Sequence, residues 1–221
     1  MHTTSREIKS NQSFAHPKLS AFVLRHLNSK FRRPYSEHSV SAFKHVAQRV
    51  LEENKPLIFD SFCGTGQSTA ILAQKHPDCM IIGIDQSEVR LSKHRPNTRN
   101  NYLLVRADTD DFWRLAAAAG WILKYHYIFY PNPWPKSGHF KRRIHGSPLF
   151  ITLLELGGCI EVRSNWQIYI EEFGMALSCT GRTAVITRID PGQPVSLFEK
   201  KYRDSNQHLW RINAKLSAEI L

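Results

Sequence analysis

Apolar positions along the chain follow two periodicities. Short continuous apolar runs, typical of strands buried on both faces, occur at 57–60, 79–85, 102–108, 124–130 and 159–165. Elsewhere apolar residues recur at three- and four-residue spacing, which predicts helices over 36–55, 68–76, 111–122, 148–156 and 166–177. Strands that alternate with helices build a parallel sheet with helices on both faces.

The end of the chain has a different pattern. Residues 182–189 and 207–216 read as strands, and we expect a long loop without a helix between them. Strands joined without a crossover helix pair antiparallel. The predicted fold is therefore α/β and Rossmann-like, with a mostly parallel seven-stranded sheet, helices on both faces and an antiparallel hairpin at the C-terminal edge.

Composition separates the first 35 residues from the rest. They are polar and basic, so we divide the chain into a basic N-terminal arm, 1–35, and a domain, 36–221. Lys and Arg outnumber Asp and Glu by 30 to 19, and residues 1–50 hold nine of these bases against two acids. Such an excess points to a polyanionic partner, either a nucleic acid or an anionic membrane surface.

Several function classes are disfavoured. The longest apolar stretch, 115–123, is far shorter than the roughly 20 residues that span a bilayer, and the polar start of the chain holds no apolar signal core. The four cysteines form no C-x-x-C pair, which argues against a zinc site or a disulfide framework. We expect a cytoplasmic protein with no membrane partner and no metal, and its oligomeric state stays open.

Polar residues follow the predicted strands where each one ends. They are Asp60, Asp85, Asp108, Asn132 and Asn165. Because ligands of such sheets bind at the carboxyl ends of the strands, we expect these side chains to converge on one rim. As single residues they are equally well explained as helix caps or turn formers.

The turn "DSFCGTG" after the first strand is typical of a nucleoside site, because Gly64 and Gly66 let the backbone approach a ligand. A dinucleotide is the alternative ligand, but the third glycine of that motif is Thr69 here. Acids at three strand ends suit a zwitterionic or cationic nucleoside, namely S-adenosylmethionine. The expected cofactor-binding residues are Asp60, Ser61, Cys63, Gly64, Gly66, Asp85, Gln86, Asp108 and Asn132.

The segment "YPNPWPKSGHFKRRIHGS", 130–147, is a stiff loop followed by bases. Its prolines exclude a helix interior or a central strand. We expect it to hold Asn132 and Trp134 toward a methyl donor, with Trp134 either stacking on a base or closing the core. Lys136, Lys141, Arg142 and Arg143 follow with no acid among them, which suits a polyanionic partner.

Three segments carry a family resemblance. "PNPWPKSGHFKRR" resembles the P-D-P-W-x-K-x-x-H-x-K-R-R signature of bacterial tRNA (guanine-N7)-methyltransferases, and "EVRSNW" and "SLFEKKY" are similar to two later segments of that family. The resemblance covers roughly 36–212. It implies a class I methyltransferase fold, S-adenosylmethionine as cofactor, tRNA as partner and guanine N7 as the methyl acceptor.

The resemblance also implies residue roles. Asp60, Asp85 and Asp108 would hold the cofactor, and Asn132 falls at the family's functional aspartate. Positions expected to contact substrate or RNA are Trp134, Lys136, His139, Lys141, Arg142, Arg143, Asn165, Ser196 and Glu199. The chain departs from the family's pattern at Phe62 for a glycine, Asn132 and Asn165 for aspartates, and Ser196 for a threonine.

Guanine N7 carries a free lone pair, so its methylation needs alignment rather than a general base. The methylated purine is cationic, and Glu199 is the candidate carboxylate to stabilise it and to accept from guanine N1–H and N2–H. Asn132 is the second candidate catalytic residue, through hydrogen bonds to a base edge. Cys63 is not expected to act as a nucleophile, and His139 and His145 lack the partners of a metal site.

Two alternatives stay open. The N-P-W sequence is similar to the N-P-P-W loops of amino-group methyltransferases, which act on adenine N6 or a comparable NH₂ group. The second alternative is an RNA-binding relative that has lost activity because Asn132 and Asn165 replace two aspartates.

Overall fold

The computed structural model describes residues 5–29, 31–190 and 192–217. Its strands are β1 (Leu57–Ser61), β2 (Met80–Asp85), β3 (Tyr102–Arg106), β4 (Leu123–Phe129), β5 (Cys159–Ser164), β6 (Ala184–Ile189) and β7 (Leu209–Lys215). They form one sheet in the order β3-β2-β1-β4-β5-β7-β6. The pairs from β3 to β5 are parallel, and β7 is antiparallel to both β5 and β6, so the predicted sheet and its antiparallel edge are confirmed.

The helices are α1 (Leu19–Leu27), α2 (Glu37–Glu53), α3 (Gln67–Lys75), α4 (Glu88–Leu91), α5 (Thr109–Ala118), α6 (Leu149–Glu155), α7 (Gln167–Ser178) and α8 (Leu197–Asp204). Two short 3₁₀ helices, η1 (Ser137–Arg142) and η2 (Ile144–Gly146), follow the proline-rich loop. The expected helix-free connection between the last two strands is wrong, because α8 lies there. Within the described residues no helix is both long and apolar enough to cross a membrane.

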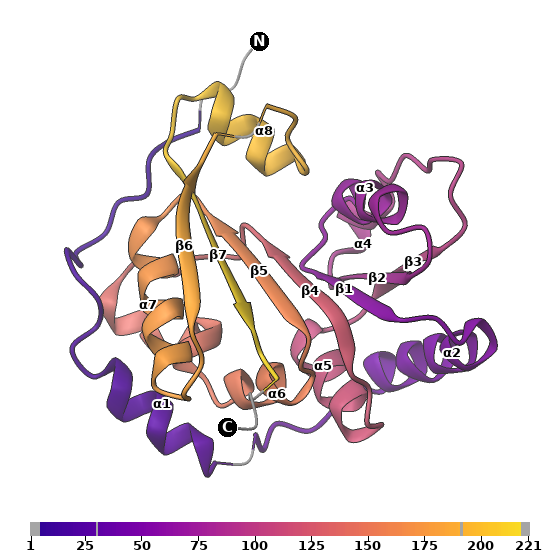
Figure 1. The fold of residues 1–221 in the computed structure, drawn as a ribbon, viewed down its shortest axis with the longest axis horizontal. Coiled ribbons are helices and arrows are strands. Elements are labelled where there is room, and N and C mark those ends of the chain that lie inside the picture. The colour runs from indigo at the N-terminus through magenta and orange to yellow at the C-terminus, as the bar shows by residue number, and fades with distance from the viewer. Residues whose placement is uncertain (1–4, 30, 191, 218–221) are drawn as a thin grey trace.

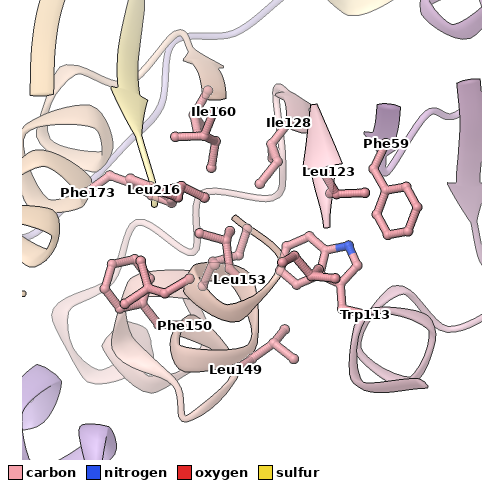
Figure 2. Packing of buried hydrophobic residues seen from close by; sticks show 14 of the residues in the cluster. Phe59, Trp113, Leu123, Ile128, Leu149, Phe150, Leu153, Ile160, Phe173 and Leu216 are labelled. Atoms are coloured by element: carbon pink, nitrogen blue, oxygen red, sulfur yellow. The ribbon is translucent and has the colours of Figure 1, made fainter. Parts of the chain in front are cut away.

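Alternation along the strands builds two core layers. Phe59 and Ile128 belong to the layer beneath α2, α5, α6 and α7, whereas Ile58 and Tyr127 face the opposite layer with α3. Figure 2 shows the larger layer, where Trp113 of α5 points into the packing between Phe59 and α6. Helices thus cover both faces and leave the strand ends for a site.

The N-terminal segment is folded onto this domain. Residues 5–18 run outside α7 before α1 begins (Figure 1), and Leu19 and Val23 of α1 are buried in the larger layer. The division into an arm, 1–35, and a domain, 36–221, stays a prediction, and its residues 1–4, 30, 191 and 218–221 lie outside the described residues.

Candidate functional site

A cleft of about 870 Å³ lies at the carboxyl ends of the central strands. It sits beside the switch between β1 and β4, where the strand order reverses and where ligands of such sheets bind. Among the predicted site residues it is lined by Asp85, Gln86, Asp108, Asn132, Trp134, Lys141 and Arg142. The expected convergence therefore holds for three strand ends, and Asp60 and Asn165 do not line the cleft.

The glycine turn after β1 has the conformation that its sequence requires. Gly64 and Gly66 have φ of 62° and 73°, a left-handed region that favours glycine. A Cβ on Gly66 would lie 2.5 Å from Leu104, whereas one on Gly64 would meet nothing within 4 Å. Phe62 also has a positive φ, 63°, so the position where the family has a glycine keeps a glycine-like backbone.

Asp85 fixes this turn to the end of β2. Its Oδ2 accepts the backbone N–H of Gly64 at 2.9 Å, and its Oδ1 accepts the N–H of Ser87 at 2.8 Å and pairs with Arg90 at 3.0 Å. The carboxylate is thus held rigidly at the cleft edge, in the place from which ribose hydroxyls are bound in folds of this kind.

Asp108 caps α5 at the end of β3. Its Oδ1 accepts the N–H groups of Asp110 and Asp111, which satisfies two free donors of the first helical turn. Arg33 donates to the same oxygen at 2.8 Å. Every one of these donors uses Oδ1, so Oδ2 has no donor among the described residues and remains an acceptor at the cleft.

Asp60 lies beneath the turn instead of in the cleft. Its Oδ2 accepts the hydroxyl groups of Ser68 and Thr69 at 2.6 Å each, and its buried Oδ1 has no partner within the described structure. Burial raises the pKa of Asp60 to about 6, against the lowering effect of these two hydrogen bonds. A cation that reached Oδ1 would offset the cost of burying this charge.

Two further turn residues also face inward. The Ser61 hydroxyl accepts from the Trp113 indole at 2.8 Å and bonds His126 at 2.8 Å, so this side chain is engaged inside the protein, and a role of Ser61 in cofactor binding stays a prediction. Burial, followed by the charges of Asp60 and Asp85, raises the pKa of the Cys63 thiol well above its usual value. Cys63 is therefore not a thiolate nucleophile.

The loop after β4 presents Asn132 and Trp134 at the cleft. Asn132 is exposed, and its Oδ1 accepts the N–H of Trp134 at 3.3 Å. The guanidinium carbon of Arg142 lies 4.7 Å from the centroid of the Trp134 ring. His139 meets the same ring edge-on, with 5.7 Å between the two ring centroids. The loop thus gathers an amide, an aromatic ring and a cation, and a contact of this group with a base and its phosphate stays a prediction.

Arg143 is not part of this exposed group. Its side chain is fully buried and pairs with Glu172, and it donates to the carbonyl oxygens of Trp134 and Lys136. The expectation that Arg143 contacts RNA is wrong, because every nitrogen of its guanidinium is used inside the protein.

Glu199 is also buried. Its Oε1 accepts from Tyr130 at 2.8 Å and from Arg163 at 2.7 Å, and its Oε2 accepts the N–H of Val195 at 2.6 Å. Ser196 caps α8 by accepting the N–H of Glu199. A contact between Glu199 and a base stays a prediction, and it requires the start of α8 to move.

The remaining predicted residues lie outside the cleft. Asn165 donates to Gln207 at 2.8 Å, which ties the end of β5 to the loop before β7. Lys136 is exposed, and a role for either residue in substrate binding stays a prediction. Among the residues that the structure describes, no group of three or more His, Cys, Asp or Glu side chains is placed to hold a metal ion.

Known proteins resemble this chain in sequence and in fold. A family model described as "Putative methyltransferase" matches residues 54–212, which span the sheet from before β1 into β7. The chain belongs to this methyltransferase family. The curated relatives include the tRNA (guanine-N(7)-)-methyltransferase of Thiobacillus denitrificans, which is 26% identical over 215 residues that cover 85% of this chain and 90% of the relative. That of Treponema pallidum (strain Nichols) is 29% identical over 154 residues, 66% of this chain and 61% of the relative.

Solved structures show the same methyltransferase fold. An antibiotic-related methyltransferase aligns with a TM-score of 0.59 at 16% identity, over 78% of this chain and 94% of its own. The 16S rRNA methyltransferase KamB aligns with a TM-score of 0.57 at 12% identity, over 83% of this chain and 95% of its own. The expected class I methyltransferase fold is confirmed.

Several cleft residues of this methyltransferase were not expected from the sequence. Phe31 and Arg33 reach the cleft from the N-terminal side, and Tyr202 reaches it from α8 beside Phe198, which lies in the segment 196–199 expected to contact substrate. Arg33 and Phe31 lie in the segment treated as an arm, where no motif points to the cleft. Phe198 and Tyr202 are four residues apart on one helical face, a spacing that was present in "SLFEKKY".

Proposed function

We propose that this methyltransferase binds S-adenosylmethionine in the cleft and transfers its methyl group to N7 of a guanine in tRNA. The observation that carries the proposal is that Asp85, Asp108 and the loop with Asn132 and Trp134 meet around one cleft. The names of the curated relatives support the same reaction.

The cleft fits the cofactor. Asp85 lies at the cleft edge for the ribose hydroxyls, and Oδ2 of Asp108, which has no donor within the described residues, can accept from an adenine amino group. Gly64 does not line the cleft itself, but a Cβ at this position would meet nothing within 4 Å, so its backbone leaves room for a ligand. When bound, S-adenosylmethionine supplies an electrophilic methyl group on its sulfonium. The acids around the cleft favour a cationic ligand over a dinucleotide pyrophosphate.

The residues of the chain supply orientation. The lone pair of guanine N7 forms the new N–C bond as the S–C bond breaks, so no proton has to be removed. Trp134 gives a stacking surface, and Asn132, held by the N–H of Trp134, gives a hydrogen-bonding group beside the base. Lys141 and Arg142 line the same cleft and offer charge for phosphates.

A nucleoside digest tests this function. The protein is incubated with tRNA and S-adenosylmethionine labelled in its methyl group, and the digested nucleosides are identified by mass spectrometry. N7-methylguanosine is the expected product, and N6-methyladenosine would instead support the amino-group reaction. Retained tRNA binding without any product would identify an inactive RNA-binding relative. The same assay with heat-treated protein is the control.

A further inference from the structure

A buried network of charges lies behind the loop that carries Asn132. Glu172 of α7 is fully buried, and its Oε2 accepts from Arg143 and from His145, the latter at 2.9 Å. Burial works to raise the pKa of Glu172, but the hydrogen bonds from His145 and Arg143 and the positive charge of Arg143 outweigh it and lower that pKa. Burial lowers the pKa of His145, so Glu172 and Arg143 form the charged pair.

The N-terminal segment enters the same network. Oε1 of Glu172 accepts from the Gln12 amide at 2.6 Å and from the His16 N–H at 2.8 Å. Gln12 in turn accepts from Arg143 at 3.0 Å. Gln12 therefore bridges both members of the ion pair, and residues 12–16 are fixed to α7.

From this position Arg143 holds the loop. Its Nε and one terminal nitrogen donate to the carbonyl oxygen of Trp134 at 3.2 and 3.1 Å, and the same terminal nitrogen reaches that of Lys136 at 3.4 Å. The N-terminal segment adds bonds from Ser10 to the Pro135 carbonyl at 2.6 Å and from the Ser137 N–H to Asn11 at 3.0 Å.

The loop needs such support. Tyr130 and Trp134 have φ of 55° and 47°, a left-handed conformation that costs free energy for bulky residues. Residues of this kind persist only where the surrounding structure fixes them. The hydrogen bonds that Arg143 donates to the carbonyl oxygen of Trp134 hold one of these two residues in its conformation.

We infer that Gln12, Arg143 and Glu172 are positioning residues, which fix the loop 130–136 and so place Trp134 and Asn132 for the methyl acceptor. The placement of Trp134 and Asn132 for a methyl acceptor rests on the proposed function. The fixing of the loop 130–136 by the buried network does not depend on that function. It makes the N-terminal segment part of the catalytic unit rather than a detached arm.

Three variants separate positioning from a merely structural ion pair. Gln12→Ala removes the bridge and leaves the ion pair in place. The double variant Arg143→Met/Glu172→Leu removes both charges together, because buried pairs are often replaced by apolar residues without loss of stability, whereas removal of one partner leaves an unpaired charge. Arg182→Met is the matched control, since Arg182 donates to the Leu216 and Thr180 carbonyls far from the cleft.

Two measurements are made on each variant. The five tryptophans are replaced by 5-fluorotryptophan, and the ¹⁹F resonance of Trp134 is assigned with Trp134→Phe. The kcat on tRNA is measured beside the Kd for S-adenosylmethionine. In Gln12→Ala and the double variant we expect the Trp134 resonance to shift and kcat to fall about 10-fold or more, with that Kd within about 2-fold of the wild-type value.

The Trp134 resonance, kcat and the methylated product together distinguish the possible outcomes. Arg182→Met should change neither the Trp134 resonance nor kcat. An unchanged Trp134 resonance with unchanged kcat in folded Gln12→Ala protein would overturn the inference, even if the double variant does not fold. If the wild-type protein forms no N7-methylguanosine, the proposed function fails, and the ¹⁹F spectra still decide whether the network fixes the loop.

Discussion

Arg33 donates to Asp108 at 2.8 Å at the mouth of the cleft, joining the N-terminal segment to the strand end that we expect to bind adenine. Both side chains are partly exposed, 46% and 32%, so the ion pair itself contributes no more than about 1 kcal/mol. The oxygen of Asp108 that we expect to bind the cofactor is Oδ2, which has no donor within the part of the chain that the structure describes.

Asp108→Asn isolates that oxygen. Asparagine is an equally good helix cap, so its Oδ1 keeps the N–H groups of Asp110 and Asp111, and its NH₂ group replaces Oδ2. A donor then faces the donor of the adenine amino group, and we expect the Kd for S-adenosylmethionine to rise about 10-fold, with an unchanged melting temperature. Isothermal titration and thermal unfolding measure the two quantities.

Arg33→Ala is the companion variant, and it should raise that Kd by no more than about 5-fold. Arg49→Ala, which breaks an exposed i,i+4 pair with Glu53 on α2, is the control for a lost surface ion pair. A larger effect from Arg33→Ala than from Asp108→Asn would contradict the proposed adenine contact.

Local patterns predicted the sheet, its edge and most helices, because buried strands and amphipathic helices leave strong periodicities. The helix α8 was missed although "SLFE" contains the Ser-x-x-Glu spacing of an N-terminal cap. The helix α1 was missed because the basic composition of its segment outweighed the helical spacing of Leu19, Phe22 and Val23.

The strand ends and the loop residues Trp134, Lys141 and Arg142 were predictable from the sequence, but the burial of neighbouring side chains was not. Arg142 and Arg143 are adjacent and alike in sequence, and only the turn between η1 and η2 makes one exposed and the other buried. Glu172 left a usable signal, because it stands between Tyr169 and Phe173 on the buried side of its helix. An acid on such a face indicates a buried partner.

The pKa of Asp60 gives a pH-dependent prediction. In the folded protein this pKa rises from 3.8 to about 6, so the contribution of Asp60 to the free energy of unfolding falls as pH rises between these values. Asp60→Asn removes the titration while its side-chain oxygen can still accept from Ser68 and Thr69. The stability of wild-type protein relative to this variant should therefore decrease from pH 4 to pH 6, as urea unfolding measures.

Cofactor affinity should change with pH in the opposite direction to stability, through the same carboxylate of Asp60. A cation that reaches the unpartnered Oδ1 favours the ionised carboxylate, so affinity for S-adenosylmethionine should rise with pH across that window in the wild-type protein and stay flat in Asp60→Asn. Asp78→Asn, at an exposed position, is the control. Parallel affinity profiles for wild-type and Asp60→Asn would exclude a cation at Asp60.

Asn132→Asp tests the electrostatics of the acceptor side. The N–H of Trp134 can hold an aspartate oxygen as it holds Oδ1 of Asn132, so the loop keeps its turn. The new charge would stabilise the positive charge that develops on guanine, and we expect kcat for N7 methylation to rise up to about 10-fold. Asn100→Asp, at an exposed position before β3 and outside the cleft, is the control. A fall in kcat for Asn132→Asp would remove the assigned role of this position.

Arg142 and Arg143 should differ in their effect on tRNA binding. Arg142 lies over the Trp134 ring beside the cleft, with its charge available for a phosphate, whereas the guanidinium of Arg143 is used within the protein. A lost phosphate contact reduces the slope of log K against log salt concentration by about 0.7–0.9. Arg142→Ala should show that change, and Arg142→Lys should retain the wild-type slope because it keeps the charge.

Fluorescence anisotropy of labelled tRNA, titrated at several salt concentrations, measures the slope, with Arg49→Ala as the control for loss of a surface arginine. An equal slope for Arg142→Ala and wild-type protein would place the RNA backbone on another face of the molecule.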